Sequence, residues 1–176
     1  MAEIKSTLDL IMERTKNLTM TEEEKKAVQR NEWEGRVRGY VQKYIDGIVN
    51  IIDMKSYVET EESKFPELRQ ILRNEILERI QPDGDNGKLL LVLEQVLDMV
   101  PKPIDKLIAL FQNNINTAMV SRKKNLKKEL ERKSISGSSV VPNLDRDEIW
   151  QEHIQKLKSD FKKKLMSIKD NELVKS

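Results

Sequence analysis

Cysteine is absent from this chain of 176 residues, and histidine occurs once, at His153. Without thiols the chain can form no disulfide, no thiolate metal site and no cysteine nucleophile. The lone histidine has Trp150 three residues before it, so the Glu-x-x-His pattern of di-metal helical bundles is missing as well. We therefore expect no metal and no cofactor, and no class of enzyme gains support from these residues.

Long apolar runs are also missing. The densest one, residues 89–100, contains Glu94, Gln95 and Asp98 and falls short of the roughly 20 apolar residues that cross a bilayer. Charged residues also interrupt the amino terminus, which lacks the continuous apolar region of a secretory signal. The sequence predicts a cytoplasmic protein that does not enter a membrane.

Charged residues make up 35% of the chain and the apolar set 38%, against about 25% and about 45 to 50% in an average globular protein. A composition that is rich in charge and poor in core residues is typical of proteins with long exposed helices. The length suits a single domain, or a small domain with a helical extension.

Apolar residues recur at spacings of three and four along most of the chain, which indicates an all-α bundle of about six helices. Thr21 and Glu24 have the spacing of a capping box that starts the second helix, and Gly47 marks a kink or short turn in it. The fourth helix opens with LLLVL and is expected to be the most buried. The expected helices cover residues 3–16, 21–58, 66–81, 88–100 and 103–133, and the last one starts at Asp145 or Asp147 and runs to residue 168.

The last two helices are expected to pair as a long antiparallel hairpin, closed by a Ser/Gly/Pro-rich loop. Counted outward from the middle of that loop, residues 122–133 would lie opposite residues 145–156. A thin core would leave an apolar seam at Phe111, Trp150 and Phe161, which a second copy of the chain could cover.

Charge divides the chain into two parts. Residues 1–100 contain 15 basic and 20 acidic residues, a net charge of −5, whereas residues 101–176 contain 17 and 10, a net charge of +7. We expect an acidic helical part and a basic hairpin part within one continuous domain. The basic charge gathers in residues 121–133, SRKKNLKKELERK.

Two features of the hairpin are candidate interaction surfaces. The basic run could neutralise the phosphates of a nucleic acid, or it could be matched by acidic residues at the start of the last helix. An apolar tripeptide in the loop either folds back on the helices or docks on another subunit. The candidate residues are Arg122, Lys123, Lys124, Lys127 and Lys128 in the basic run, and Val140, Val141 and Pro142 in the loop.

Two other patterns have ordinary structural interpretations. Asp83, Asp85 and Glu94 occupy positions one, three and twelve of a calcium-binding loop, but a lysine stands where the sharp turn needs glycine. We interpret this segment as a turn in which Asp or Asn caps the next helix. Gly35 and Gly39 are four residues apart, and we expect close packing of a helix against them.

Three segments together resemble a family of uncharacterised bacterial all-helical proteins: the opening MAEIKSTLDLIMERT, the TEEEKK start of the second helix, and the GSSVVPNL loop before an acidic helix that contains Trp150. The resemblance spans most of the chain. It implies a bacterial cytoplasmic setting, and it implies no activity, cofactor or catalytic residue.

From these observations we expect a non-enzymatic helical protein that acts through self-association or through a protein partner. The first alternative is nucleic-acid binding by residues 122–133. The second is an enzyme whose site assembles from dispersed carboxylates. Salt-sensitive binding would favour the first alternative, and a deep polar cleft would favour the second.

Overall fold

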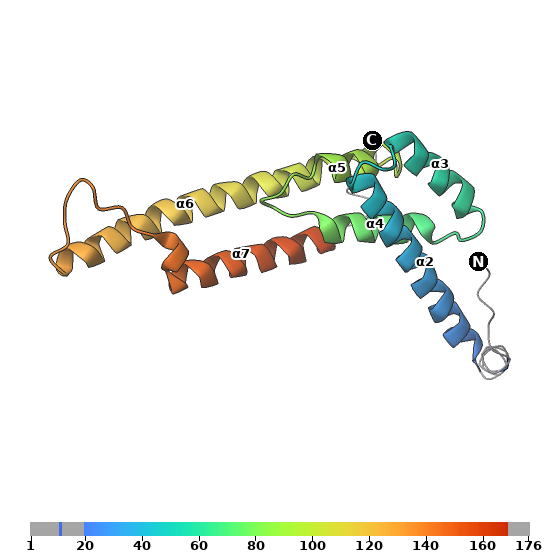
Figure 1. Cartoon of the computed structure of the whole chain (residues 1–176), viewed down its shortest axis with the longest axis horizontal. Helices are drawn as coiled ribbons and strands as arrows, with labels where there is room; N and C mark the ends of the chain where they lie inside the picture. Colours follow the sequence, from blue (N-terminus) through green and yellow to red (C-terminus); the bar gives the residue numbers. More distant parts are fainter. Residues whose placement is uncertain (1–10, 12–19, 169–176) are drawn as a thin grey trace, which may run out of the picture.

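The computed structural model describes residue 11 and residues 20–168 (Figure 1). The helix predicted over residues 3–16 therefore lies outside the described residues, except for residue 11. The rest of the all-α prediction, including the long carboxy-terminal hairpin, is confirmed. Along residues 20–168 the elements are α2 (Glu22–Ile45), α3 (Ile51–Glu62), α4 (Leu68–Arg79), α5 (Gly87–Gln95), α6 (Lys102–Arg132), the 3-10 helix η1 (Leu144–Arg146) and α7 (Glu148–Ser167).

Local hydrogen bonds determine where α2 and α3 begin. The Thr21 hydroxyl accepts from the backbone N–H of Glu24, and the Glu24 carboxylate accepts from the N–H of Thr21, so the predicted capping box is confirmed. Asn50 and Asp53 form a second capping box at α3, which the sequence analysis did not identify. Between the two helices Gly47 adopts a φ of +77°, so the chain makes a turn there.

Two predictions about the middle of the chain are wrong. The fourth predicted helix is shorter than expected, because α5 ends at Gln95 and Asp98 adopts a φ of +56°, outside the helical region. It is also not the most buried helix. Leu91, in the middle of the apolar run, is 40% exposed, whereas α4 buries six side chains because it contacts α2, α3, α5 and α7.

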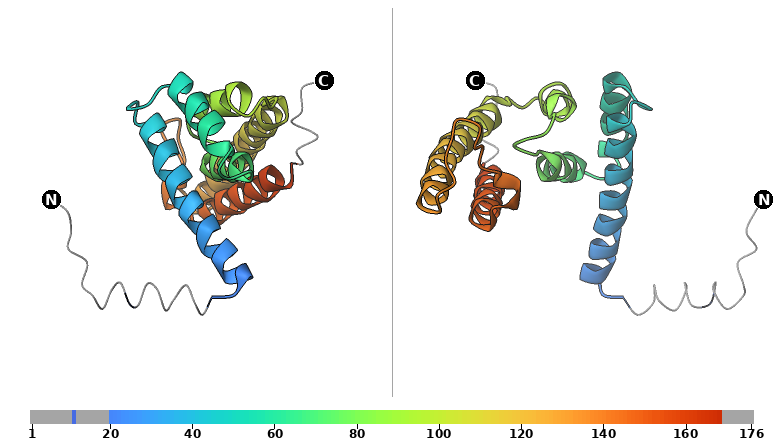
Figure 2. Two further views of the ribbon diagram at one scale, coloured as in Figure 1. Left: turned by 90° about the vertical axis from the view of Figure 1, so that its right-hand side faces the viewer. Right: turned by 60° about the vertical axis from the view of Figure 1, so that its left-hand side comes forward.

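The helices lie in three layers, which the right-hand view of Figure 2 separates. The α6–α7 hairpin forms one outer layer, α4 and α5 form the middle layer, and α2 with α3 forms the other outer layer. The hairpin overlaps the other layers only at its root and extends well beyond them as an arm (Figure 1).

One apolar core joins the layers, and it includes residues from both the acidic and the basic part of the chain. Its fully buried side chains come chiefly from α4, with contributions from every other α-helix between residues 20 and 168. The largest of them are Met54, Leu68, Leu72, Ile76, Leu77, Ile80, Leu93, Ile104, Leu165, Val37 and Val41. Among the described helices, none has the length and apolar character that a membrane span requires.

Candidate interaction surface of the carboxy-terminal hairpin

The arm is built from two helices of unequal length. α6 has 31 residues, which corresponds to about 45 Å at 1.5 Å per residue, and Pro103 stands in its first turn, where a missing N–H is harmless. α7 has 20 residues and runs back along α6. The free end of the arm is therefore made of α6 and the loop that follows it.

Arg122 and Asp147 fasten the two helices together. Nη2 and Nε of Arg122 lie 2.7 and 3.0 Å from the two carboxylate oxygens of Asp147, which is a bidentate ion pair. Asp147 also caps α7, because its Oδ1 accepts from the N–H of Trp150 at 2.7 Å. Hydrogen bonding to Arg122 is the main reason that the pKa of Asp147 lies below its ordinary value, and the same contact raises the pKa of Arg122.

This pair also corrects the predicted register of the hairpin. Arg122 was expected opposite residue 156, but it faces Asp147, so α6 continues for ten residues beyond the start of α7. The loop is not a symmetrical tip: after Lys133 the chain returns along the end of α6 in non-helical conformation before η1 begins. Residues 123–132 consequently have the loop beside them and not α7.

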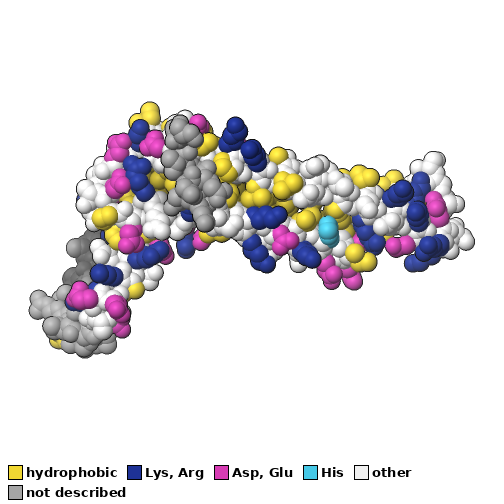
Figure 3. All heavy atoms as spheres, turned by 180° about the vertical axis from the view of Figure 1, so that it is seen from behind, with side chains coloured by type: hydrophobic (Ala, Val, Ile, Leu, Met, Phe, Trp, Pro, Cys, Tyr) yellow, Lys and Arg dark blue, Asp and Glu magenta, His cyan; other side chains and the backbone are white. Residues whose placement is uncertain are grey.

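The acidic start of α7 therefore neutralises Arg122 but none of the four lysines that follow it in the basic run. Lys123, Lys124, Lys127 and Lys128 are exposed, and none of them forms an ion pair with any residue that the structure describes. Arg122 alone is matched, by Asp147 and by Glu129 at 3.3 Å. Basic side chains gather at the free end of the arm in Figure 3.

The apolar tripeptide of the loop is partly buried and partly exposed, so it matches neither expected arrangement completely. Val140 and Pro142 are half-buried, whereas the Val141 side chain is 78% exposed. The expected local cluster is incomplete, because Leu144 is buried but Ile135 is 49% exposed. The loop thus partly buries Val140 and Pro142 and still presents Val141 to solvent.

The seam predicted at Phe111, Trp150 and Phe161 is not exposed. These residues are only 5%, 6% and 3% accessible, and the rings of Phe111 and Phe161 meet edge to face with centroids 5.6 Å apart. The prediction is wrong because the stripes of α6 and α7 cover each other.

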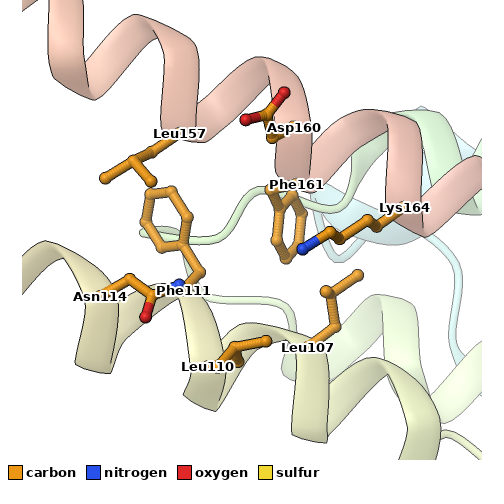
Figure 4. Close-up of a pocket in the computed structure, with 8 residues that line it drawn as sticks. All are labelled: Leu107, Leu110, Phe111, Asn114, Leu157, Asp160, Phe161 and Lys164. Atoms are coloured by element: carbon orange, nitrogen blue, oxygen red, sulfur yellow. The ribbon is translucent and has the colours of Figure 1, made fainter.

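An apolar groove that the sequence analysis did not identify remains open beside these two rings. It has a volume of about 190 Å³ and runs between α6 and α7 (Figure 4). Leu110, which is 48% exposed, lies one step off the predicted stripe, so periodicity alone did not select it. The groove is lined by Leu107, Leu110, Phe111 and Asn114 from α6, and by Leu157, Asp160, Phe161 and Lys164 from α7.

The root of α7 is fixed to the end of α4 by lysines on its other side. Lys162 donates to the carbonyl oxygens of Leu77 and Glu78, which belong to the last turn of α4, and burial lowers the pKa of Lys162. Lys158 pairs with Asp83 at 2.7 Å. Lys158 and Lys162 therefore face the bundle, whereas Asp160 and Lys164 line the groove.

The calcium-like segment is a structural turn. The Asp83 carboxylate accepts a hydrogen bond from Lys158, which lowers the pKa of Asp83. Asp85 accepts from the N–H of Gly87 at 3.0 Å. Asn86 does not cap α5; its buried side chain instead bonds to both backbone groups of Gln81. Within the described residues no cluster of acidic or histidine side chains could hold a metal ion.

His153 is exposed, and its ring stacks on Trp150 at a centroid distance of 6.1 Å. The two residues are three positions apart on α7, and side chains at this spacing are neighbours on a helix surface.

A polar hollow at the α4–α5 turn is the feature closest to a polar cleft. It has a volume of about 650 Å³ but is open to solvent, and its basic groups make structural bonds. Lys88 donates to the carbonyl of Ile45 at the end of α2, and Arg79 bonds to Glu75 and Gln42. These side chains connect helices.

The expected close packing at Gly35 and Gly39 is wrong. No atom of the neighbouring elements lies within 4 Å of a Cβ built at either position, because the two glycines face away from the core side of α2. They border a shallow groove together with the stacked rings of Tyr40 and Tyr57, whose centroids are 4.0 Å apart.

A scan against protein-family models, a search of the curated proteins and a search of the solved structures find no match to this chain.

Proposed function

We propose that this chain is a non-enzymatic interaction protein that presents the α6–α7 hairpin as its binding arm, either to a second copy or to a protein partner. The observation that carries the proposal is the groove at Leu110: an apolar surface that stays open on an arm extending beyond the bundle. Exposed apolar area of this kind marks interaction surfaces. The resemblance to bacterial all-helical proteins and the lack of cysteine agree with a cytoplasmic setting, which belongs to the same proposal.

Nucleic-acid binding is the second candidate. It is favoured by one observation, the four exposed lysines of residues 123–128 that have no acidic partner among the described residues. Lysines in this state can neutralise phosphates and release counterions. No aromatic side chain lies among them to stack on bases, so the binding would depend on charge.

Affinity purification of the full chain from native cells, followed by identification of the molecules that co-purify, tests both candidates. The variants are Leu110→Glu in the groove and a neutralised chain with Lys→Gln at 123, 124, 127 and 128. Recovery of a discrete protein, or of untagged copies of the chain, that is lost in either hairpin variant supports the interaction arm. Recovery that neither variant reduces contradicts it.

Gel-shift assays separate the second candidate. If the lysines bind nucleic acid, affinity falls steeply between low and moderate salt, and neutralising four lysines reduces the slope of log K against log salt by about 3 to 4. The absence of a shift at low salt removes nucleic-acid binding.

A further inference from the structure

We propose that the groove at Leu110 is the centre of a two-fold interface in which the hairpin of one chain lies face to face with the hairpin of a second copy. This inference rests on the proposed function and names the occupant of the binding arm. In the interface each α6 would pack antiparallel on the other α6, and each α7 on the other α7.

The groove faces away from the rest of the chain. Lys158 and Lys162 point from α7 to Asp83 and to the end of α4, whereas Asp160 and Lys164 border the groove on another side of the same helix. The hairpin is one of the two outer layers of the fold, as the right-hand view of Figure 2 shows. A second hairpin can therefore approach without displacing a described element.

Charge complementarity selects a second copy of the chain as the occupant. Asp160 and Lys164 lie at the mouth of the groove, and neither forms an ion pair with any residue that the structure describes (Figure 4). They are four residues apart, one acidic and one basic, on a surface whose floor is apolar. A surface with this pattern is complementary to itself when it is turned about a two-fold axis.

The register of the hairpin places Leu110 at the level where a two-fold axis would pair Asp160 with Lys164 of the other copy. Because Phe111 and Phe161 pack against each other, Leu110 lies level with residue 162, which is midway between Asp160 and Lys164. A two-fold axis at that level, midway between the two stacked hairpins, parallel to their planes and perpendicular to their helices, places each Asp160 level with Lys164 of the other copy. Each residue lies about 3 Å along the helix from the axis, at 1.5 Å per residue.

The same axis brings Leu110 of one copy against Leu110 of the other. Each leucine would fill part of the groove of about 190 Å³ beside the Phe111 and Phe161 rings. The interface then has an apolar centre with two reciprocal ion pairs beside it, which is the usual arrangement of a hydrophobic core with a polar rim.

Sedimentation equilibrium of the full chain over a range of concentrations tests the inference, and a dimer is expected. Leu110→Glu should raise its dissociation constant about tenfold or more, since a half-exposed leucine on each copy loses its apolar partner. Val120→Glu is the matched control, because this 65% exposed residue lies on α6 outside the groove. It should leave the dissociation constant unchanged.

Charge exchange tests the symmetry. Asp160→Lys alone and Lys164→Asp alone should each weaken the dimer, because they place like charges opposite each other, and the double variant should recover it. A merely structural role for either residue would not give this recovery. Failure of the double variant to recover the dimer contradicts the proposed axis.

Because the chain contains no cysteine, a single introduced thiol reports on one position only. Under mild oxidation Leu110→Cys should give a covalent dimer, while Val120→Cys should give little. A strict monomer at high concentration, or a dimer unaffected by Leu110→Glu, overturns the inference. If the chain is monomeric but still captures a discrete protein that Leu110→Glu abolishes, the inference fails and the proposed function stands; if neither behaviour depends on the hairpin, both fail.

Discussion

Asp147 performs two tasks with one carboxylate: its Oδ1 accepts from the N–H of Trp150 and from Nε of Arg122, and its Oδ2 accepts from Nη2 of Arg122. The first bond starts α7, and the pair with Arg122 fixes α7 against α6. The pairing of the two helices of the arm thus depends on a residue that the sequence identifies only as a candidate helix start.

Two substitutions at residue 147 should separate these tasks. Asp147→Asn keeps a capping oxygen but loses the charge, and we expect a loss of unfolding free energy of about 1 kcal/mol. Asp147→Ala loses the cap as well and should cost about 1 kcal/mol more. Urea denaturation measures both, with Asp145→Asn as a control, since the Asp145 side chain is exposed. Equal losses in the two variants would mean that the cap contributes nothing.

The stability of the hairpin should depend on pH in the acid range. Hydrogen bonding to Arg122 lowers the pKa of Asp147 in the folded chain, and bonding to Lys158 lowers that of Asp83. Groups of this kind stabilise the fold above their unfolded pKa of about 4, and the contribution is lost as pH falls through the folded pKa. The free energy of unfolding should therefore fall below about pH 4, and less steeply in Asp147→Asn. An identical acid profile in that variant would contradict the role of the pair.

Helix starts and turns were largely predictable because they depend on neighbouring residues. The box of Thr21 and Glu24 needs only a hydroxyl and a carboxylate three residues apart, and Gly47 permits a positive φ that other residues avoid. The box of Asn50 and Asp53 has the same spacing and is predictable in the same way. Such features are local, and tertiary packing reinforces them without creating them.

Long-range features were less predictable. The degree of burial of α5 depends on which elements cover it, and LLLVL does not reveal that Leu91 faces solvent. The register of the hairpin depends on how the loop returns, and counting from its middle assumed a symmetrical tip. The groove depends on both the covering of each helix and the register of the hairpin. Leu110 is apolar, but it lies off the stripe of α6 that pairs with α7.

Alanine at two glycines should have opposite effects. Gly47→Ala should destabilise the chain by roughly 1 to 2 kcal/mol, because a φ of +77° is unfavourable for a residue with a Cβ. Gly35→Ala should stabilise it by about 0.5 to 1 kcal/mol, because a Cβ there meets no atom within 4 Å and alanine favours the helix. Thermal and urea unfolding measure both. Destabilisation by Gly35→Ala would instead indicate that a neighbouring helix packs closely against this glycine.

The junction between the arm and the bundle should be sensitive to a cavity. Leu165 is completely buried near the end of α7 within the common core, and Leu165→Ala should cost roughly 2 to 5 kcal/mol. The adjacent Met166 is 44% exposed, and Met166→Ala should change the unfolding free energy by no more than about 0.5 kcal/mol. Similar losses in the two variants would show that the arm is not packed on the bundle as described.

The four lysines of the basic run should contribute little to folding. These lysines make no ion pair among the described residues, so Lys→Gln at 123, 124, 127 and 128 removes charge without breaking a contact. Surface changes of this kind alter the unfolding free energy by about 0.5 kcal/mol or less each. Had the hairpin followed the predicted register, the same variant would lose several ion pairs to the acidic start of α7, and stability would fall with a dependence on salt. Urea unfolding at low and moderate salt distinguishes unpaired from paired lysines. If the lysines were paired, the variant would be less stable than the natural chain at low salt, and the difference would shrink at moderate salt. If they are unpaired, the two chains should have similar stability at both salt concentrations.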